Sequence, residues 1–593
     1  MPGLTGIIDF KNKIEDDVLP EMVKVQIHEK FYSVEKFNFQ DNIHVARIKT
    51  GLIDEGEFPY TEDNLVILFA GEMFNDECQS ISSQSFIASQ YKQHGENFLN
   101  NLNGSFTLLL IDKGKMICYL STDRNWHGNL FYAEVNNRIF FSSEYKSISG
   151  FLQKPLKPSN NAIVSFMTSG SLIGGEAFIE GIKALYGGKS LMITPVSYRE
   201  VIWWRIKFTN ERKDNPDLLY DEMKHHLMKA VERRIRTKGN YALALSGGWD
   251  SKGILALFLK QKEASDIKTI SWGYNQHLPD SDGYIARDIS DMLNIKHFWF
   301  EYNPHDFPLF TKDYIRISEG IIDDLLKFPS SFNHFKAIRE VLGIEILLHG
   351  DQYFGYDDIP DNDLEMYEHI GLNYLENQSF LKRILKRNAY MELDDINREI
   401  ISSYLKNAEH YENRLDKRDF VLFYVRKIFF QGPGNYFKHK FFISRNPGLD
   451  YDLFNFVTSL SGDFRKNKYL YKKVICDIEP RLFKIQAESN NEFSFKEMCL
   501  KNPGWSKFLY QTLLEKDSIL SEYVDLNKLK EEIDLFLIPD KKPSLVRSYT
   551  KRIPQLKRIY RSVFPQKHNL EINSGRLLHR LLSLQLTFKE FLK

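Results

Sequence analysis

Residues 241–260, which read YALALSGGWDSKGILALFLK, constrain the fold of this 593-residue chain more than any other stretch. The apolar run at 241–245 predicts a strand, and the apolar run at 254–259 predicts a helix that begins directly after a short polar turn. That turn, residues 246–251, contains two glycines, which allow the backbone to approach an anion closely. Because free N–H groups at a helix start favour negative charge, the pattern indicates a nucleotide phosphate site.

The turn differs from two common phosphate loops. No Gly-Lys-Ser/Thr follows it, and it lacks the G-x-G-x-x-G spacing of dinucleotide sites. It is similar to the S-G-G-x-D-S pyrophosphate loop of the ATP pyrophosphatase group, whose members cleave ATP to AMP and pyrophosphate. An ordinary glycine-containing turn between a strand and a helix is the alternative interpretation.

Length and charge limit the classes of protein to consider. A chain of 593 residues is too long to fold around a single hydrophobic core, so at least two domains are expected. Hydrophobic residues make up 42% and charged residues 27%, which is typical of globular proteins. Lys and Arg together number 79, as do Asp and Glu, so no overall field favours nucleic acid or an anionic membrane. We therefore expect no nucleic-acid partner.

Four widely spaced cysteines, Cys78, Cys118, Cys476 and Cys499, form no C-x-x-C pair. This fits neither a disulfide framework nor a zinc site, and indicates small buried side chains in a reducing compartment. The N-terminus lacks a basic segment followed by an apolar core, and no apolar run approaches the ~20 residues that span a bilayer. We therefore expect a cytoplasmic protein without membrane insertion.

The first 200 residues contain short apolar and alternating segments separated by turns, which predict a mainly antiparallel, strand-rich domain. One helix is expected at 83–102, and the polar segment at 203–217 indicates a linker. After it, predicted strands alternate with helices: strands at 241–245, 267–272, 296–302 and 344–348, and helices at 218–234, 254–259 and 282–293. Such alternation implies a parallel sheet covered on both faces, with ligands beyond the carboxyl ends of its strands. The turn at 246–251, Trp272 and Asp351 would meet at that edge.

Residues 400–593 are predicted to be largely helical, ending in a leucine-rich helix at 577–592. A basic segment at 541–567 precedes that helix. Two interpretations of it stay open: a solvated surface, or a binding arm for an acidic peptide or carrier.

Motifs in the first 190 residues resemble those of the class II glutamine amidotransferases, in the same order. They are M-P-G-L-T-G-I at 1–7, A-G-E-M-F-N at 70–75, L-N-G-S-F at 102–106, D-R with a following glycine at 123–128, F-F-S-S-E-Y-K at 140–146, and 181–188 at the end of the domain. The second half adds S-G-G-W-D-S at 246–251, S-W-G at 271–273, D-S-D-G-Y-I-A-R at 280–287, G-D-Q-Y-F-G-Y at 350–356 and R-N-P-G-L-D at 445–450. Together they resemble the asparagine synthetase B type family, which includes beta-lactam synthetase and lasso-peptide cyclases.

The resemblance implies a two-domain fold of mixed α/β and α+β class. Residues 1–205 would form an Ntn-type sandwich of antiparallel sheets with helices. Residues 218–593 would form a doubly wound parallel sheet, similar to the adenine nucleotide alpha hydrolases, with additional helices.

Two departures concern glutamine hydrolysis, which in this family uses an N-terminal cysteine thiolate as nucleophile. Position 2 is Pro2, which has no thiol, and Ala70 stands where the family has an asparagine oxyanion donor. Loss of one such donor costs ~10²- to 10³-fold in rate. We therefore expect a glutaminase-inactive scaffold domain, as in beta-lactam synthetase and many peptide cyclases; a divergent but working site is the alternative.

In the second half the resemblance implies adenylation of a carboxylate by ATP with Mg²⁺. Asp250 and Asp351 would ligate Mg²⁺, and the backbone of Ser271 and Trp272 would meet adenine. The remaining nucleotide contacts would come from Ser246, Gly247, Gly248, Ser251 and Gly350. A helix cap for Asp250 and a turn position for Asp351 are the structural alternatives.

Two further departures concern the catalytic residues. The acidic segment of the family is shortened here to residues 349–352, and Gln352 stands in place of its second glutamate. The lysine that the family places on the pyrophosphate side has no counterpart at the matching position. Lys484 is the nearest substitute, with a surface lysine as the alternative; other basic candidates are Lys466, Lys468 and Arg445. His349 at the sheet edge is a candidate base for an incoming amine, or a structural histidine.

The sequence thus predicts an ATP- and Mg²⁺-dependent amide-forming ligase that does not hydrolyse glutamine, in peptide or natural-product biosynthesis such as macrolactam formation. Its partners would be a carboxylate substrate and an amine, carried by a peptide or a carrier, with a homodimer or a precursor peptide and protease as protein partners. Two alternatives stay open: an ammonia-dependent enzyme amidating a small acid or sugar acid, and a non-catalytic ATP-binding scaffold.

Overall fold

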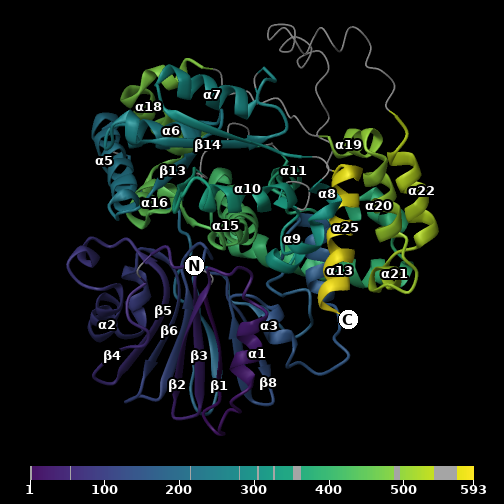
Figure 1. Ribbon diagram of the computed structural model, residues 1–593, viewed down its shortest axis with the longest axis horizontal. Coiled ribbons are helices and arrows are strands. Elements are labelled where there is room, and N and C mark those ends of the chain that lie inside the picture. The colour runs from purple at the N-terminus through teal and green to yellow at the C-terminus, as the bar shows by residue number, and fades with distance from the viewer. Residues whose placement is uncertain are drawn as a thin grey trace.

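The computed structural model describes residues 3–592 except 54, 214, 280, 304–305, 325–327, 351–358, 360–361, 486–493 and 540–570. The described helices include none that is long and apolar enough to cross a membrane. Figure 1 shows two parts, an N-terminal pair of sheets below and a mostly helical part above that surrounds a third sheet.

The N-terminal part consists of two six-stranded antiparallel sheets. The first has the order β10-β8-β9-β1-β3-β2 and the second the order β12-β11-β7-β6-β5-β4. Their bounds are β1 Gly3–Ile8, β2 Ser33–Phe39, β3 Ile43–Lys49, β4 Tyr60–Glu62, β5 Leu65–Met73, β6 Gly104–Asp112, β7 Ile117–Thr122, β8 Phe131–Val135, β9 Arg138–Ser142, β10 Lys183–Ala184, β11 Lys189–Ile193 and β12 Tyr198–Ile202. The helices are α1 Val18–Lys24, η1 Asp76–Gln79, α2 Ser83–His94, η2 Gly95–Asn101, α3 Lys146–Ser149 and α4 Asn160–Ser169.

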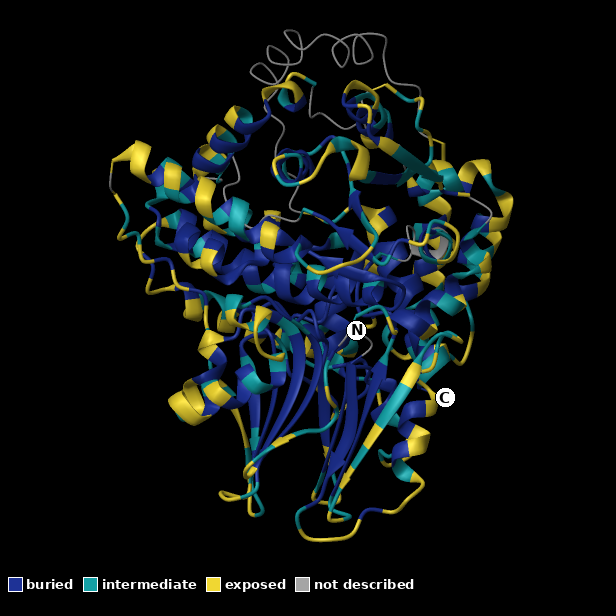
Figure 2. Cartoon of the chain, turned by 60° about the vertical axis from the view of Figure 1, so that its left-hand side comes forward, coloured by how far each residue is buried: buried dark blue, intermediate teal, exposed yellow. Residues whose placement is uncertain are grey.

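Strand β5 shows why this part contains nearly continuous apolar runs. Val66, Leu68 and Ala70 belong to the core between the two sheets, whereas Ile67 and Phe69 belong to a second core that includes residues of α2. Because successive side chains of a strand point to opposite faces, a strand buried on both faces needs apolar residues at every position. Figure 2 shows the sheet interiors in the dark blue of buried residues.

The C-terminal part is built around a five-stranded parallel sheet with the order β15-β14-β13-β16-β17. The strand order reverses between β13 and β16, which makes their carboxyl ends the topological switch point where ligands bind in such folds. The strands are β13 Tyr241–Ala244, β14 Lys268–Gly273, β15 Lys296–Glu301, β16 Ile346–Leu348 and β17 Ile443–Arg445. The helices next to them in sequence are α5 Pro216–Ile235, α6 Trp249–Phe258, α7 Asp282–Met292 and α10 Phe328–Glu340.

Further helices surround this sheet. They are η3 Ala264–Asp266, α8 Asp306–Leu309, α9 Thr311–Ser318, α11 Asp363–His369, η4 Leu375–Asn377, α12 Ser379–Ile384, α13 Arg387–Ala408, α14 Arg414–Leu422, the π-helical η5 Phe423–Gln431, α15 Gly432–His439, η6 Pro447–Leu449, α16 Tyr451–Ser459, α17 Gly462–Arg465, η7 Lys466–Lys468, α18 Tyr469–Ile478, η8 Pro480–Phe483, α19 Phe495–Lys501, α20 Pro503–Leu513, α21 Ile519–Tyr523, α22 Leu526–Phe536 and α25 Ser574–Phe591. The last helix, yellow in Figure 1, returns to the N-terminal part, where Phe588 packs on Phe178 and Phe591 on Tyr145.

The predicted fold class is confirmed: antiparallel sheets in the first part and a parallel sheet in the second. The helix predicted at 83–102 is divided, because α2 ends at Gly95, whose φ of 55° lies in the left-handed region that favours glycine. Strand β17 was missed by the sequence analysis, since its three residues lie in a stretch predicted as helical. The basic segment predicted at 541–567 lies outside the described residues.

Candidate nucleotide-binding site

The polar turn after β13 folds back on itself through its two serines. Ser246 donates its backbone N–H to Ser251 Oγ at 3.1 Å, and the two hydroxyl oxygens lie 2.9 Å apart. Gly248 precedes α6, and its backbone N–H donates to Ser246 Oγ at 3.3 Å. The turn therefore presents hydroxyl groups and N–H groups together at the start of a helix, as an anion site requires.

A carboxylate already lies against this turn. Gly247 donates its backbone N–H to Asp282 Oδ1 at 3.0 Å. Asp282 is the first residue of α7, which Ser281 caps through its side chain. The Gly247 N–H therefore already has an acceptor within the protein. The sequence analysis missed Asp282, although a serine cap followed by an acidic residue marks a helix start close to the end of β14.

Asp250 forms an ion pair with a lysine that lies 218 positions later in the chain. Lys468 Nζ lies 2.7 Å from Asp250 Oδ1 and 2.8 Å from Oδ2. The pair is partly exposed, with 17% of the lysine side chain and 23% of the aspartate side chain accessible. Among the three extra basic candidates from the sequence, the structure brings Lys468 to the turn.

The backbone holds Lys468 in an unusual conformation. Asn467 and Lys468 have φ angles of 55° and 53°, in the left-handed region, directly before α18 begins. A residue other than glycine is held there at a cost of about 1 kcal/mol or more, and such residues cluster at functional sites. The conformation aims an ammonium group at Asp250.

The end of β16 approaches the turn so closely that only glycine fits. A Cβ on Gly350 would lie 2.7 Å from the carbonyl carbon of Asp250 and 3.0 Å from Ser251 N. His349 is 5% exposed, and its backbone N–H donates to Arg445 O at 3.1 Å. The predicted metal ligand Asp351 and Gln352 lie outside the described residues.

Ser271 and Trp272, predicted to meet adenine, lie in β14 beside the turn. The buried Ser271 donates its hydroxyl to Leu245 O at 2.6 Å, which ties β14 to the residue that precedes the turn. Trp272 is partly exposed, and its ring packs edge-on against Phe335 of α10 at 6.0 Å. These positions agree with a shallow aromatic surface next to the phosphate turn.

Lys484 follows η8 and is exposed. Its neighbour Phe483 stacks on Trp249 of the turn, with ring centroids 5.0 Å apart and an interplanar angle of 14°. Lys252 reaches the same segment by donating to Ile485 O at 3.2 Å. The segment that carries Lys484 is therefore packed against the turn through aromatic rings. Its catalytic role stays a prediction.

Arg445, at the end of β17, joins the nucleotide side to the N-terminal part. Its guanidinium is buried and bonds the Glu72 carboxylate through Nε at 3.0 Å and through a second, shorter contact. The same guanidinium donates to Thr237 Oγ1 at 3.0 Å. Glu72 belongs to the A-G-E-M-F-N motif, so two motif residues meet at the contact between the two parts.

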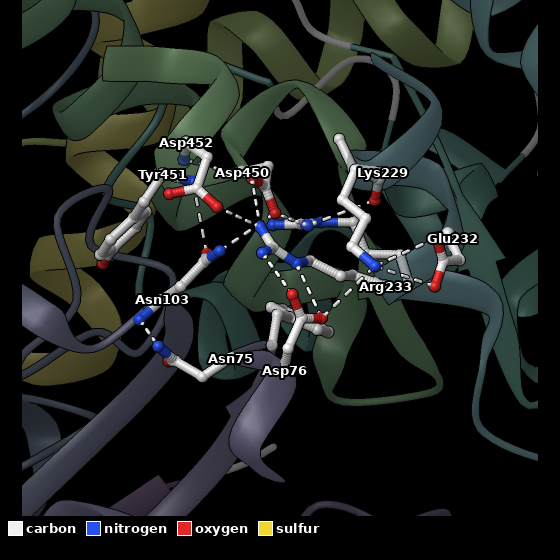
Figure 3. A network of polar contacts seen from close by, with 12 residues as sticks. Asn75, Asp76, Asn103, Lys229, Glu232, Arg233, Asp450, Tyr451 and Asp452 are labelled. Carbon is white, nitrogen blue, oxygen red and sulfur yellow. Dashed lines mark hydrogen bonds and ion pairs between the residues drawn. The ribbon is translucent and has the colours of Figure 1, made fainter. Parts of the chain in front are cut away.

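Figure 3 shows a second polar network across the same contact. Asp450 accepts from Arg233 at 3.0 Å, from Asn103 Nδ2 at 3.0 Å and from Arg234 at 2.6 Å. Arg233 also bonds Asp76 of η1 at 2.8 Å. Arg234 and Asp450 are nearly inaccessible to solvent, so these ions must be paired to be tolerated. The motif residues Asn103 and Asp450 therefore serve to hold the two parts together.

In the N-terminal part, a buried carboxylate lies next to Ala70. Gly71 follows it in β5, and its backbone N–H donates to Glu55 Oε1 at 2.8 Å. Glu55 is 6% exposed, and burial raises the pKa of its carboxyl. A protein carboxylate thus takes the backbone donor beside the expected oxyanion position. Pro2 lies outside the described residues.

Comparisons with known proteins agree with this division. Residues 1–204 match the model of a glutamine amidotransferase domain, and residues 222–534 match that of asparagine synthase. An asparagine synthetase (glutamine-hydrolyzing) 2 from Arabidopsis thaliana is 24% identical over 349 residues, which cover 54% of this chain and 53% of the relative. The corresponding protein of Bacillus subtilis is 23% identical over 300 residues, which cover 46% of this chain and 40% of the relative. The match thus spans about half or less of these two relatives.

A solved structure of the glutamine phosphoribosylpyrophosphate amidotransferase from B. subtilis, complexed with ADP and GMP, covers 50% of this chain and 65% of its own, at 12% identity and a TM-score of 0.25. The asparagine synthase match alone covers more than half of the chain and includes the phosphate turn and its lysine. The chain therefore belongs to the asparagine synthase family of ATP-dependent amide-forming ligases.

Proposed function

We propose that the chain adenylates a substrate carboxylate with ATP and Mg²⁺ and joins it to an amine without hydrolysing glutamine. The observation that carries this proposal is the contact between Gly71 N–H and the buried Glu55 carboxylate, in a chain with Pro2 and Ala70. An oxyanion would lose its side-chain donor and meet a backbone donor that already has an acceptor. Pro2 also lacks the thiol with which this family starts the attack on glutamine.

In the proposed reaction the phosphate turn binds ATP. Ser246, Ser251 and the N–H groups of the turn would hold the pyrophosphate, and Lys468 would balance its charge. Attack of the substrate carboxylate on the α-phosphorus forms the acyl-adenylate and releases pyrophosphate. An amine then attacks the acyl carbon, the amide bond forms, and AMP leaves.

The donors present fit a magnesium site of the kind that relies on substrate phosphates. Asp250 offers hard carboxylate oxygens at the turn, and Mg²⁺ takes one or two carboxylates together with phosphates and water. Among the described residues, no group of three or more His, Cys, Asp or Glu is arranged to hold a metal. When bound, Mg²⁺ would neutralise charge on the phosphates. Asp250 and the predicted Asp351 would hold it.

The amine would come from the substrate itself, from a carrier-bound intermediate or from a peptide, as in macrolactam formation. The proposed loss of glutamine hydrolysis leads to this, because such an enzyme would have no internal source of ammonia. His349, buried at the end of β16, would accept the amine proton. A precursor peptide with its protease, or a second copy of the chain, are the protein partners that this function would involve.

The test is turnover by the purified protein with ATP, Mg²⁺ and panels of carboxylates and amines. Pyrophosphate and AMP released in equal amounts, with glutamine neither consumed nor required, is the expected result. Turnover that needs ammonium and a small acid would instead favour the amidation that the relatives' names describe. If Asp250→Ala abolished nucleotide binding but left the biological activity intact, a scaffold role would replace both enzymatic ones.

A further inference from the structure

A cavity of about 300 Å³ lies between the two parts of the molecule, separate from the phosphate turn. Tyr186 and Trp204 come from the end of the N-terminal part, while Tyr404, Phe420 and Tyr424 come from α13, α14 and η5. No residue of the turn lines it. Its volume, and a wall that combines aromatic residues with a few polar and charged groups, are typical of pockets that bind small molecules.

Several contacts fix the positions of the aromatic residues in the cavity wall. Tyr404 donates its hydroxyl to Ile173 O at 2.8 Å, and Tyr186 packs against Phe429 with centroids 4.9 Å apart. Trp204 packs edge-on against Phe423 and Phe454. Tyr424 lies in the nine-residue π-helix η5, and π-helical segments occur frequently at functional sites. Lys189, which also lines the cavity, has its ammonium 4.0 Å from the Tyr186 ring centroid and pairs with Glu200 at 2.6 Å. We call the rings of Tyr186, Trp204, Tyr404 and Tyr424 in the cavity wall the aromatic slot.

Charged groups of both signs line the same cavity. Arg205, from the segment after β12, is exposed and bonds Asn407 Oδ1 at 3.2 Å. Glu399 on α13 is also exposed and lines the cavity. An exposed guanidinium and an exposed carboxylate at an aromatic slot complement a molecule with one carboxylate, one ammonium group and a ring.

We infer that this cavity binds a free aromatic α-amino acid. Its ring enters the slot formed by Tyr186, Trp204, Tyr404 and Tyr424, its carboxylate pairs with Arg205, and its ammonium group pairs with Glu399. The ligand bridges the N-terminal part and α13, so its binding stabilises the contact between the two parts. The inference is independent of the proposed ligase reaction.

The test is calorimetric titration of the full chain with L-phenylalanine, L-tyrosine and L-tryptophan, with L-leucine as the aliphatic reference. At least one aromatic amino acid should bind at least about 10-fold more tightly than leucine, since a ring contributes stacking beyond its buried area. Arg205→Gln and Glu399→Gln should each weaken binding by about 3- to 10-fold, as expected for partly exposed charge-assisted contacts.

A filled cavity provides the decisive comparison. Ser403→Trp places an indole at the cavity, whereas Ser402→Trp places the same group at an exposed neighbouring position that does not line it. Binding should be lost in the first variant and kept in the second, with both retaining the unfolding temperature of the parent. No binding of any aromatic probe at millimolar concentration, or equal binding by both variants, would overturn the inference.

Discussion

Among single residues, Lys468 makes the contact that most directly links structure to the proposed chemistry. Replacing it by Met removes the ammonium group 2.7 Å from Asp250. Because a charge-assisted contact to phosphate contributes about 1.5–3 kcal/mol, we expect ATP to bind about 10- to 100-fold more weakly. Equilibrium binding of ATP to the purified variant measures this loss. The control is Lys473→Met on α18, the helix that follows Lys468; the ammonium of Lys473 lies over Tyr220. Equal effects of both changes would contradict the assignment.

Gly350 offers a test that changes no charge. In Gly350→Ala the new Cβ would lie 2.7 Å from the carbonyl carbon of Asp250, which cannot move without displacing the phosphate turn. We therefore expect ATP binding to fall at least about 10-fold and the protein to lose about 1–3 kcal/mol of stability, the usual cost of overpacking. Gly504→Ala, at a position with open space around the glycine, should change neither. Unfolding in urea with and without ATP measures both quantities.

Candidate site residues were easiest to group from the sequence where they are close together in the chain, whereas Gly350 and Ser271 came from motifs in other segments. Ser246, Gly248 and Ser251 could be predicted because they occupy one turn between a strand and a helix. Asp282 could not be assigned to the turn, because its contact with Gly247 depends on where α7 begins in space. Lys468 was only one of several basic residues, since its distance to Asp250 is set by packing across 218 positions.

At the scale of elements, the segment after β7 depends on one buried aspartate. Asp123 is fully buried, its pKa is raised to about 6 by that burial, and its carboxylate accepts backbone N–H groups from Phe106, Asn125, His127 and Gly128. In Asp123→Asn the side-chain NH₂ group would point at backbone N–H groups that now donate to the carboxylate. We therefore expect the free energy of unfolding to fall by about 2–3 kcal/mol. The urea midpoint measures it. Asp63→Asn, at an exposed ion pair with Lys92, should leave the midpoint nearly unchanged.

The elements themselves were predicted best where a strong pattern extends over many residues. Helices α5, α7 and α25 begin and end within three residues of their predictions, because their apolar positions recur at helical spacing. Strand β17 has three residues and no periodicity to detect, and it is a strand only because β16 lies beside it. Short elements of this kind are determined by tertiary contacts rather than by local sequence.

At the scale of the whole molecule, buried ionisable groups connect the two parts. One of them, His28, should make the stability depend on pH. His28 Nε2 lies 2.9 Å from Glu144 Oε2, beside Lys146 and Lys440, with Glu319 in the same cluster. Burial lowers the pKa of His28 to about 3, even though the Glu144 charge raises it. Below pH 6.5 the histidine binds a proton in the unfolded chain but not in the folded one, so its contribution lowers stability as the pH falls. Burial raises the pKa of Glu319 to about 7, which acts in the opposite direction.

The expected size of the His28 effect is about 2 kcal/mol at pH 5, from 1.36 kcal/mol per pH unit below the ordinary pKa of histidine. His28→Asn, which keeps a donor for Glu144, should therefore lose less stability between pH 7 and pH 5 than the parent does. Urea unfolding at the two pH values measures the difference. His94→Gln, at the exposed end of α2, is the matched control; an unchanged pH slope in His28→Asn would show that another group causes the acid sensitivity.

These contacts could not be predicted from the sequence. The net charge of zero does not say which charges pair, and partners such as Glu72 and Arg445 lie 373 positions apart. Pairing of this kind becomes visible only when the two parts are placed together. It also gives the N-terminal part a chain of contacts to the nucleotide side. Glu72 supports Arg445, whose backbone carbonyl accepts the N–H of His349 at the end of β16.

Glu72→Gln tests this influence. The buried guanidinium of Arg445 would lose the charge that compensates it, so we expect about 2 kcal/mol lower stability and weaker ATP binding, although Glu72 lies in the other part of the molecule. Glu62→Gln, which breaks the more exposed pair with Lys92, should affect neither by more than about 1 kcal/mol. Urea unfolding and ATP titration of both variants give the comparison. If Glu72→Gln lowered stability but left ATP affinity unchanged, the N-terminal part would support the fold without positioning the nucleotide site.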